Sequence, residues 1–328
     1  MRTPIRAWCE RFAFIAAAIS LMAVPGASAQ EQFPGNRPIE LTVLFPAGTS
    51  ADVTARVLAE GMARQLNTTI VVVNRPGAGG AIGYKYAAAQ SADGHHVVWN
   101  SNSISTTYHS GTLAFDYQAF DPVAQVQVET PLLVVKADSP WRNLHEIIAY
   151  AKANPGKVTV GNSGAGSHTH FSSVALFKTA GADVIDVPFG AAQVVPSLLG
   201  GHVNAVLQLP GALASLVKAG SLRVLAVLSA KRDPIFPEVA TAREQGINVA
   251  AELWRGVVVP KGTPKAVVAK LEDAIRKTVA SPEFVKSSER LLVTPAFLPA
   301  REFGTVIARE DGEIARMMQT LGLSKSAN

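Results

Sequence analysis

Two short stretches of the sequence combine small residues and a helix-capping hydroxyl directly after a strand-like run. The first is Phe45-Pro46-Ala47-Gly48-Thr49-Ser50, and the second is Gly161-Asn162-Ser163-Gly164-Ala165-Gly166-Ser167, about 115 residues later. At such a turn the first backbone N–H groups of the helix have no partner within it, and the helix dipole adds partial positive charge. An anion can therefore bind there without a lysine or arginine. An ordinary capped turn has the same composition, so either stretch alone leaves both interpretations open.

The common phosphate-binding motifs are incomplete in this chain. Gly164-Ala165-Gly166-Ser167-His168-Thr169 begins like a dinucleotide-binding fingerprint but lacks its last glycine, and Gly77-Ala78-Gly79-Gly80-Ala81-Ile82 fails at the same place. No glycine-lysine-serine/threonine P-loop occurs. We therefore expect no nucleotide and no other cofactor.

The histidines of the second stretch could serve a metal ion or a catalytic serine. His168 and His170 are two residues apart, with His95 and His96 as further donors. On a helix, side chains two residues apart diverge by about 200°, and no cysteine or paired carboxylate supports them. The nucleophile-elbow pattern around Ser163 lacks its final glycine. We expect neither a metal site nor catalysis here, and we interpret both histidines as residues that brace the loop.

Three further side chains have a structural and a functional interpretation. Asp52 is interpreted as an acid of a first helical turn that faces the helix dipole and Arg56. Trp99 and Trp254 could stack on a ligand or belong to the core, and the sequence does not decide between these two alternatives.

The elements that must position these residues alternate between β-branched runs and helical segments, which indicates an α/β fold with largely parallel strands. The strands are expected at 41–45, 69–73, 96–99, 131–135, 158–160, 184–187, 205–207, 224–228 and 256–259. A helix is expected over 50–66 with Ser50 as its N-cap, and a second over 264–280 with Thr263 as its cap. Ser281 should cap the helix that follows.

The N-terminus has the features of a secretory signal peptide that is cleaved after Ala29. Three arginines precede an apolar run of about 13 residues, which is too short to span a bilayer. Without residues 1–29 the chain has 27 basic and 24 acidic side chains, a net charge of +3, and no cysteine. No cluster of lysine and arginine is present, so a nucleic-acid partner is not expected.

A series of short motifs extends in order along nearly the whole mature chain. It consists of Phe33-Pro34, Phe45-Pro46-Ala47-Gly48 with Asp52 and Arg56, Asn74-Arg75-Pro76-Gly77-Ala78-Gly79-Gly80, Ala92-Asp93-Gly94, Gly164-Ala165-Gly166-Ser167 with His170, Leu198-Leu199-Gly200-Gly201, Ser229-Ala230-Lys231-Arg232, Trp254 with Gly256, and Pro260 with Gly262-Thr263-Pro264. Each motif is modest, but the ordered set resembles the Bug family, the periplasmic solute-binding proteins of tripartite tricarboxylate transporters.

The resemblance implies an α/β fold of two domains, a type II-like Venus flytrap whose domains are joined by crossover strands. Residues 30–131 with 252–328 would form the first domain and 132–251 the second, after a signal peptide over 1–29. The implied function is capture of a carboxylate-bearing ligand in the cleft and its delivery to the permease subunits of the transporter. Such a protein is periplasmic and is not an enzyme.

In this family the ligand carboxylate sits between the two glycine-rich loops, one from each domain, which agrees with the interpretation of the two stretches as anion sites. The expected ligand-binding residues are Pro46, Ala47, Gly48, Thr49, Ser50, Asp52, Asn102, Ser163, Gly164, Ala165, Gly166, Ser167, His170, Gln208, Trp254 and Arg255.

Two departures from the family pattern concern the ligand. Gln208 stands where the family commonly has an acid, which removes a partner for an amino-acid ammonium group. Arg255 is a cation where the family often has a neutral or aromatic residue. We therefore expect a carboxylate without an ammonium group, with a second acidic group near Arg255. The alternatives are a sensor subunit for a membrane receptor kinase, and an enzyme on the same fold with His170 as its base.

Overall fold

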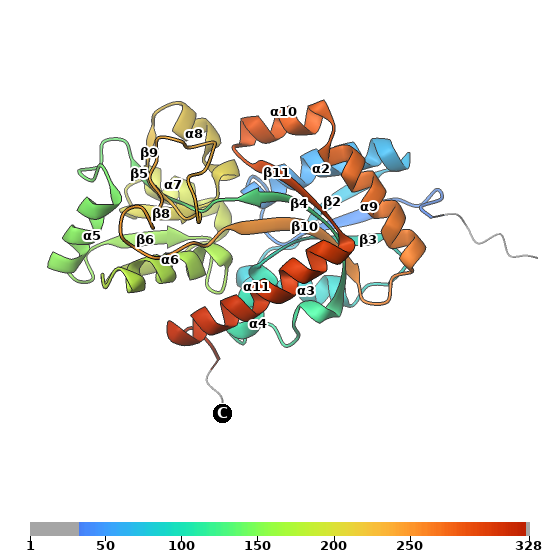
Figure 1. Ribbon diagram of the computed structural model, residues 1–328, viewed down its shortest axis with the longest axis horizontal. Coiled ribbons are helices and arrows are strands. Elements are labelled where there is room, and N and C mark those ends of the chain that lie inside the picture. Colours follow the sequence, from blue (N-terminus) through green and yellow to red (C-terminus); the bar gives the residue numbers. More distant parts are fainter. Residues whose placement is uncertain (1–32, 326–328) are drawn as a thin grey trace, which may run out of the picture.

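The computed structural model describes residues 33–325, so the predicted signal peptide lies outside the described residues. The chain forms two lobes, each built on its own β-sheet (Figure 1). Within residues 33–325, no helix is both long enough and apolar enough to cross a membrane.

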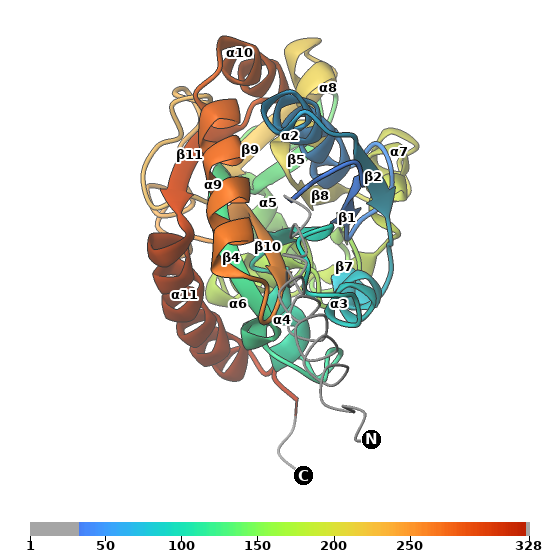
Figure 2. The same ribbon diagram turned by 90° about the vertical axis from the view of Figure 1, so that its right-hand side faces the viewer.

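The first lobe contains a six-stranded sheet in the order β11-β4-β10-β3-β1-β2. Its strands are β1 (Ile39–Val43), β2 (Ile70–Asn74), β3 (His96–Ser101), β4 (Phe120–Glu129), β10 (Leu253–Pro260) and β11 (Thr294–Pro299). One face is covered by α2 (Ser50–Leu66), α9 (Lys265–Val279) and α10 (Pro282–Leu291), and the other by α3 (Ala81–Ala88), α4 (Ser103–His109) and the start of α11 (Ala300–Thr320). Figure 2 shows α9 and α11 lying across the strands of this sheet.

The second lobe contains a five-stranded sheet in the order β7-β6-β8-β5-β9. Its strands are β5 (Leu132–Lys136), β6 (Thr159–Asn162), β7 (Ile185–Pro188), β8 (Ala205–Gln208) and β9 (Leu222–Val227). The helices α5 (Leu144–Ala153) and α6 (His168–Thr179) pack on one face, and α7 (Val194–Leu199) and α8 (Ala214–Lys218) lie on the other side.

The chain crosses between the lobes twice, from β4 to β5 and from the segment after β9 to β10. In Figure 1, β4 and β10 run side by side across the middle of the molecule, with α11 diagonal to them. We infer that the predicted domain boundaries follow these crossings. α11 belongs to both lobes, because Phe303 and Ile307 pack in the core of the first and Ile314 and Met318 in the core of the second.

Several expectations about the elements need correction. Each of the nine predicted strands is present, eight of them with both ends within two residues and β10 beginning three residues earlier than predicted, but β4 and β11 were missed. Four strand pairings are parallel and five antiparallel, so the strands are not largely parallel. The antiparallel pairs arise where the crossover strands enter each sheet.

The predicted helix caps also differ in two places. Thr49, with extended backbone, caps α2, and Ser50 is the first helical residue. Thr263 caps no helix: its hydroxyl donates to the Pro260 carbonyl, and Pro264 precedes α9 without a side-chain cap. Ser281 caps α10 as expected, accepting from the Phe284 N–H at 3.2 Å.

Candidate functional site

A small pocket of ≈ 20 Å³ lies between the lobes. Its walls come from the N-terminal ends of α2 in the first lobe and α6 in the second, and Leu253 and Arg255 of β10 also line it. Two helix N-termini distant in the sequence therefore face one pocket, which is the arrangement that the resemblance to the Bug family implied.

The first wall is organised by Thr49 and Asp52. The Thr49 hydroxyl accepts from the Asp52 N–H at 3.4 Å and donates to the Pro46 carbonyl at 2.7 Å. Gly48 adopts a φ of +80°, in the left-handed region that favours glycine, and its N–H donates to Asp52 Oδ2 at 3.0 Å. The N–H groups of Ser50 and Ala51 find no partner among the described residues, because they belong to the first turn of α2.

Asp52 supports this loop from behind and does not line the pocket. Its carboxylate accepts from Arg56 Nε at 3.0 Å and from Asn74 Nδ2 at 2.9 Å, besides Gly48. Burial opposes ionisation, but these hydrogen bonds outweigh it and hold the pKa of Asp52 below its usual 3.8. Asp52 therefore keeps its charge and fixes the shape of the loop.

The second wall follows the same plan. Ser167 caps α6 by accepting from the His170 N–H at 3.2 Å. Within the loop, the N–H of Ser163 donates to Thr169 Oγ1 at 2.9 Å, and that of Gly164 to Asn162 Oδ1 at 3.2 Å. In the part of the chain that the structure describes, the N–H groups of His168 and Thr169 have no partner, and both residues line the pocket.

The two histidines occupy different environments. His168 is buried, and its Nε2 lies 2.8 Å from the Ala251 carbonyl oxygen. Burial lowers the pKa of His168 to about 4, with Arg255 adding to the effect and the hydrogen bond to Ala251 opposing it. The ring is therefore neutral, Nε2 donates, and Nδ1 is left as an acceptor. His170 Nδ1 accepts from the Gly166 N–H at 3.4 Å, which is a bracing contact.

A buried ion pair lies beside the pocket. Arg255 Nε donates to Glu129 Oε1, and both side chains are almost completely enclosed, at 2% and 0% exposure. The Ser50 hydroxyl donates to Glu129 Oε2, and Gln127 Nε2 donates to Oε1 at 3.2 Å. The pair forms because β4 and β10 are antiparallel neighbours in which Arg255 lies opposite Gln127. Arg255 lines the pocket, and its charge is compensated by Glu129. The reason for expecting a second acidic ligand group near Arg255, a cation without a partner, therefore does not hold.

Residues 54–323 match the family described as the tripartite tricarboxylate transporter family receptor. The chain belongs to this family. It is 32% identical over 317 residues to the "UPF0065 protein in gbd 5'region" of Cupriavidus necator, an alignment that covers 94% of this chain and 95% of that one.

Solved structures of family members agree with the fold. The periplasmic binding protein BugD is 28% identical, with a TM-score of 0.84 over 88% of this chain and 99% of that one. R. palustris Rpa4515, solved with adipate, is 26% identical, with a TM-score of 0.84 over 89% and 99%. The two lobes are thus the two domains of a Venus flytrap, in a family of periplasmic solute-binding proteins.

The expected binding residues of this family member fall into four groups, the last of which is Asn102 and Trp254. Thr49, Ser50, Ser163, Ser167, Gln208 and Arg255 line the pocket. Pro46, Gly164 and Ala165 line a wider hollow at its mouth, which also includes Ser163. Ala47, Gly48, Asp52, Gly166 and His170 belong to the same two loops but line neither space.

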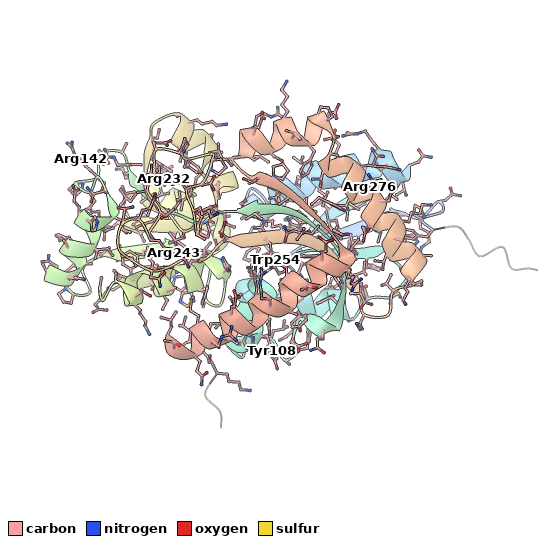
Figure 3. The ribbon with its side chains drawn as sticks, viewed as in Figure 1. Tyr108, Arg142, Arg232, Arg243, Trp254 and Arg276 are labelled. Carbon is pink, nitrogen blue, oxygen red and sulfur yellow. The ribbon has the colours of Figure 1, made fainter. Side chains whose placement is uncertain are left out.

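Asn102 and Trp254 do not line the pocket, contrary to expectation. Asn102 Nδ2 donates to Glu310 at 2.8 Å, and Asn102 Oδ1 accepts from the Trp254 N–H at 3.1 Å. The Trp254 ring packs edge-on against Phe303, with ring centroids 5.0 Å apart. Figure 3 shows Trp254 in the middle of the molecule, beside α11. Of the two alternatives for Trp254, the structure therefore agrees with a side chain of the core.

Eight of the 14 residues that line the pocket were not among the expected binding residues, including Ser103, His168 and Thr169. Glu129, behind the pocket, was not anticipated either. Ser103 lines the pocket at the start of α4, and its hydroxyl is buried without a partner among the described residues. Glu129 lies directly behind Arg255 and Ser50. The only feature of the sequence that could have drawn attention to Glu129 is its position as a lone acid after the alternating run Val126-Gln127-Val128. Without the strand pairing, nothing connected that acid to Arg255.

The cleft is closed in this structure. Thr106 of α4 donates to the Gly166 carbonyl of the opposite domain at 2.8 Å. Gly79, in the turn Ala78–Gly80, lies so close to the second loop that an added Cβ would be 2.9 Å from the Ala165 oxygen. The two domains therefore meet along the loops that form the pocket.

Proposed function

We propose that this protein is exported, cleaved after Ala29, and captures a small carboxylate in the periplasm between its two domains. It then presents the closed form to the permease subunits of a tripartite tricarboxylate-type transporter. The observation that carries the proposal is the pair of helix N-termini, α2 and α6, whose unpartnered N–H groups face one pocket.

The two-domain arrangement explains why binding and closure are coupled. Each domain alone supplies half of the anion site, namely Ser50 and Ala51 from one, and His168 and Thr169 from the other. A carboxylate gains both sets of N–H donors only when the domains close, so it stabilises the closed form relative to the open one. The adipate in the R. palustris relative supports a carboxylate as the ligand class.

The residues around the pocket favour a ligand without an ammonium group. An ammonium needs a carboxylate partner when it is removed from water. The family position for such an acid carries Gln208, whose side chain is held by Ser163 Oγ at 3.1 Å and by the Leu209 N–H at 2.8 Å. The buried Glu129 is already paired with Arg255.

A thermal-shift screen against carboxylic acids, aspartate and glutamate tests the proposal. A ligand that binds only the folded protein raises stability by roughly 2.7 kcal/mol at a hundredfold excess over Kd. We expect simple carboxylic acids to raise Tm and the two amino acids to have no effect.

The Gly48→Asp variant tests whether the first loop is the carboxylate site. A Cβ at Gly48 meets no atom within 4 Å, so the new carboxylate should repel the ligand without a steric clash. Gly156→Asp is the matched control, since Gly156 also has a positive φ, +68°, and open space, but lies in another turn. The proposal is wrong if no carboxylate raises Tm, or if folded Gly48→Asp keeps the full shift.

A further inference from the structure

Three polar groups that line the pocket lack protein partners among residues 33–325. The Ser103 hydroxyl and His168 Nδ1 are buried and make no hydrogen bond to any described residue. Ser103 is 1% exposed and His168 is 2% exposed. Arg255 donates to Glu129 through Nε only, which leaves both Nη groups without a described acceptor. Buried polar groups are nearly always satisfied, so such a cluster in a binding pocket indicates groups that a ligand completes.

The charge of this cluster is already balanced. Arg255 is the only arginine, lysine, aspartate or glutamate that lines the pocket, and Glu129 compensates it from behind. His168 is neutral, since burial lowers its pKa to about 4. A ligand carboxylate at the two helix N-termini is served by their N–H groups. A second carboxylate at the cluster would be a buried charge without a free counterion, which is strongly unfavourable.

The hydrogen-bonding character of the cluster also disfavours a second carboxylate. Arg255 offers donors, Ser103 can donate or accept, and His168 Nδ1 can only accept because Nε2 carries the proton toward Ala251. A carboxylate has acceptors alone and would face the lone pair of His168. An amide or hydroxyl group has both a donor and an acceptor.

We propose that Ser103, His168 and Arg255 bind a second, uncharged group of the ligand, an amide or a hydroxyl. The preferred solute is then a monocarboxylate with a neutral polar end, and a dicarboxylate is disfavoured. This inference rests on the proposed function, and Glu129 is the residue that determines the specificity by cancelling the charge of Arg255.

Calorimetric titration with dicarboxylic acids of four to six carbons and their half-amides tests this inference at pH 7.5. Wild type should bind the best half-amide at least tenfold more tightly than the corresponding diacid. Glu129→Gln keeps the shape of the side chain but exposes the charge of Arg255. It should therefore shift the half-amide-to-diacid ratio at least tenfold toward the diacid.

Ser103→Ala provides a second variant that does not disturb the ion pair. Because this hydroxyl has no protein partner, its loss should leave Tm of the ligand-free protein unchanged and weaken half-amide binding about five- to tenfold. Ser105→Ala is the matched control, a buried serine of the same helix that does not line the pocket. It should bind like wild type.

The outcomes separate this inference from the proposed function. If no carboxylate of either kind binds, the proposed function is wrong and the inference falls with it. Tighter binding of diacids by wild type, or an unchanged ratio in folded Glu129→Gln, overturns the inference alone. If Glu129→Gln does not fold, the Ser103→Ala titration decides, and unchanged half-amide affinity overturns the inference.

Discussion

At the scale of single residues, the position of one helix cap determines which hydroxyl reaches the ion pair. The sequence predicted Ser50 as the cap of α2, whereas Thr49 takes this position with extended backbone. Ser50 is then free to donate to Glu129. Both hydroxyls suit a cap, and the choice between them depends on the loop, where Thr49 also bonds the Pro46 carbonyl.

Asp52→Asn is predicted to destabilise the protein at neutral pH and to reduce its acid sensitivity. The folded pKa of Asp52 lies below 3.8, so its contribution is complete above that pH and is lost as pH falls through the folded pKa. Loss of the buried ionic hydrogen bonds should cost about 1–3 kcal/mol. Urea unfolding at pH 7 and pH 3 measures both effects, and equal destabilisation at the two pH values would contradict the assignment. Asp273 is an exposed acid that pairs with Arg276 and Lys277 of its own helix, so Asp273→Asn should change the free energy of unfolding little at either pH.

At the scale of elements, α11 connects the two domains along one side of the hinge. Phe303 and Ile307 pack in the first domain, whereas Ile314 and Met318 pack in the second. Lys178 of α6 donates to the Leu321 carbonyl at 2.5 Å, and this hydrogen bond holds the C-terminal end of α11 against the second domain. Any relative motion of the domains therefore has to bend α11 or release its last turns.

Glu310 lies in α11 between these two packed segments. Burial raises its pKa to about 7, with Glu313 and Glu252 adding to the rise and Arg309 opposing it. Asn102 Nδ2 donates to its carboxyl group at 2.8 Å. Because the folded protein holds this proton more tightly than the unfolded chain, stability should fall as pH rises from 4.5 to about 7.

We predict that Glu310→Gln removes this pH dependence. Between pH 5 and pH 8 the wild-type protein should lose stability on the order of 2–3 kcal/mol from this group, and the variant should not. Glutamine still accepts from Asn102, so the packing is preserved. Urea unfolding at the two pH values measures the difference, with Glu313→Gln, one turn away, as the control. The same pH dependence in wild type and Glu310→Gln would refute the assignment.

At the scale of the whole molecule, closure brings backbone against backbone across the cleft. Gly79 of the first domain meets the loop from Ala165 to Ser167, where an added Cβ would lie 2.9–3.0 Å from main-chain atoms. Main chain held by a capped helix cannot yield as a flexible side chain does. A methyl group added at this contact should therefore hold the two domains further apart in the closed form without changing the fold of either domain.

Gly79→Ala is predicted to weaken ligand binding at least tenfold by hindering closure. Gly156→Ala is the matched control, because both glycines have a φ near +67° but nothing lies within 4 Å of a Cβ at Gly156. Backbone strain should be similar in the two variants, about 1–2 kcal/mol. Calorimetry with the ligand found in the screen measures affinity, and X-ray scattering measures compaction. Normal compaction of Gly79→Ala on ligand addition would show that this contact does not limit closure.

The missed strands show where local patterns were insufficient. β11 contains Pro295 and Pro299 and forms an edge of its sheet, where proline is tolerated. β4 alternates glutamines with valines and contains Pro122, which resembles a loop more than a buried strand. The partners of both strands lie far along the chain, and only those pairings make them strands.

The sequence by itself determined the two domains' repeated plan of strand, small-residue turn and capped helix, because caps, turn glycines and hydrophobic periodicity are local properties of the chain. It thereby predicted the two helix ends that line the pocket. Only the tertiary structure decided which charged groups lie beside the pocket. Arg255 and Glu129 are 126 residues apart and meet through the antiparallel pairing of β4 and β10, so the balanced charge beside the pocket is a property of the folded sheet.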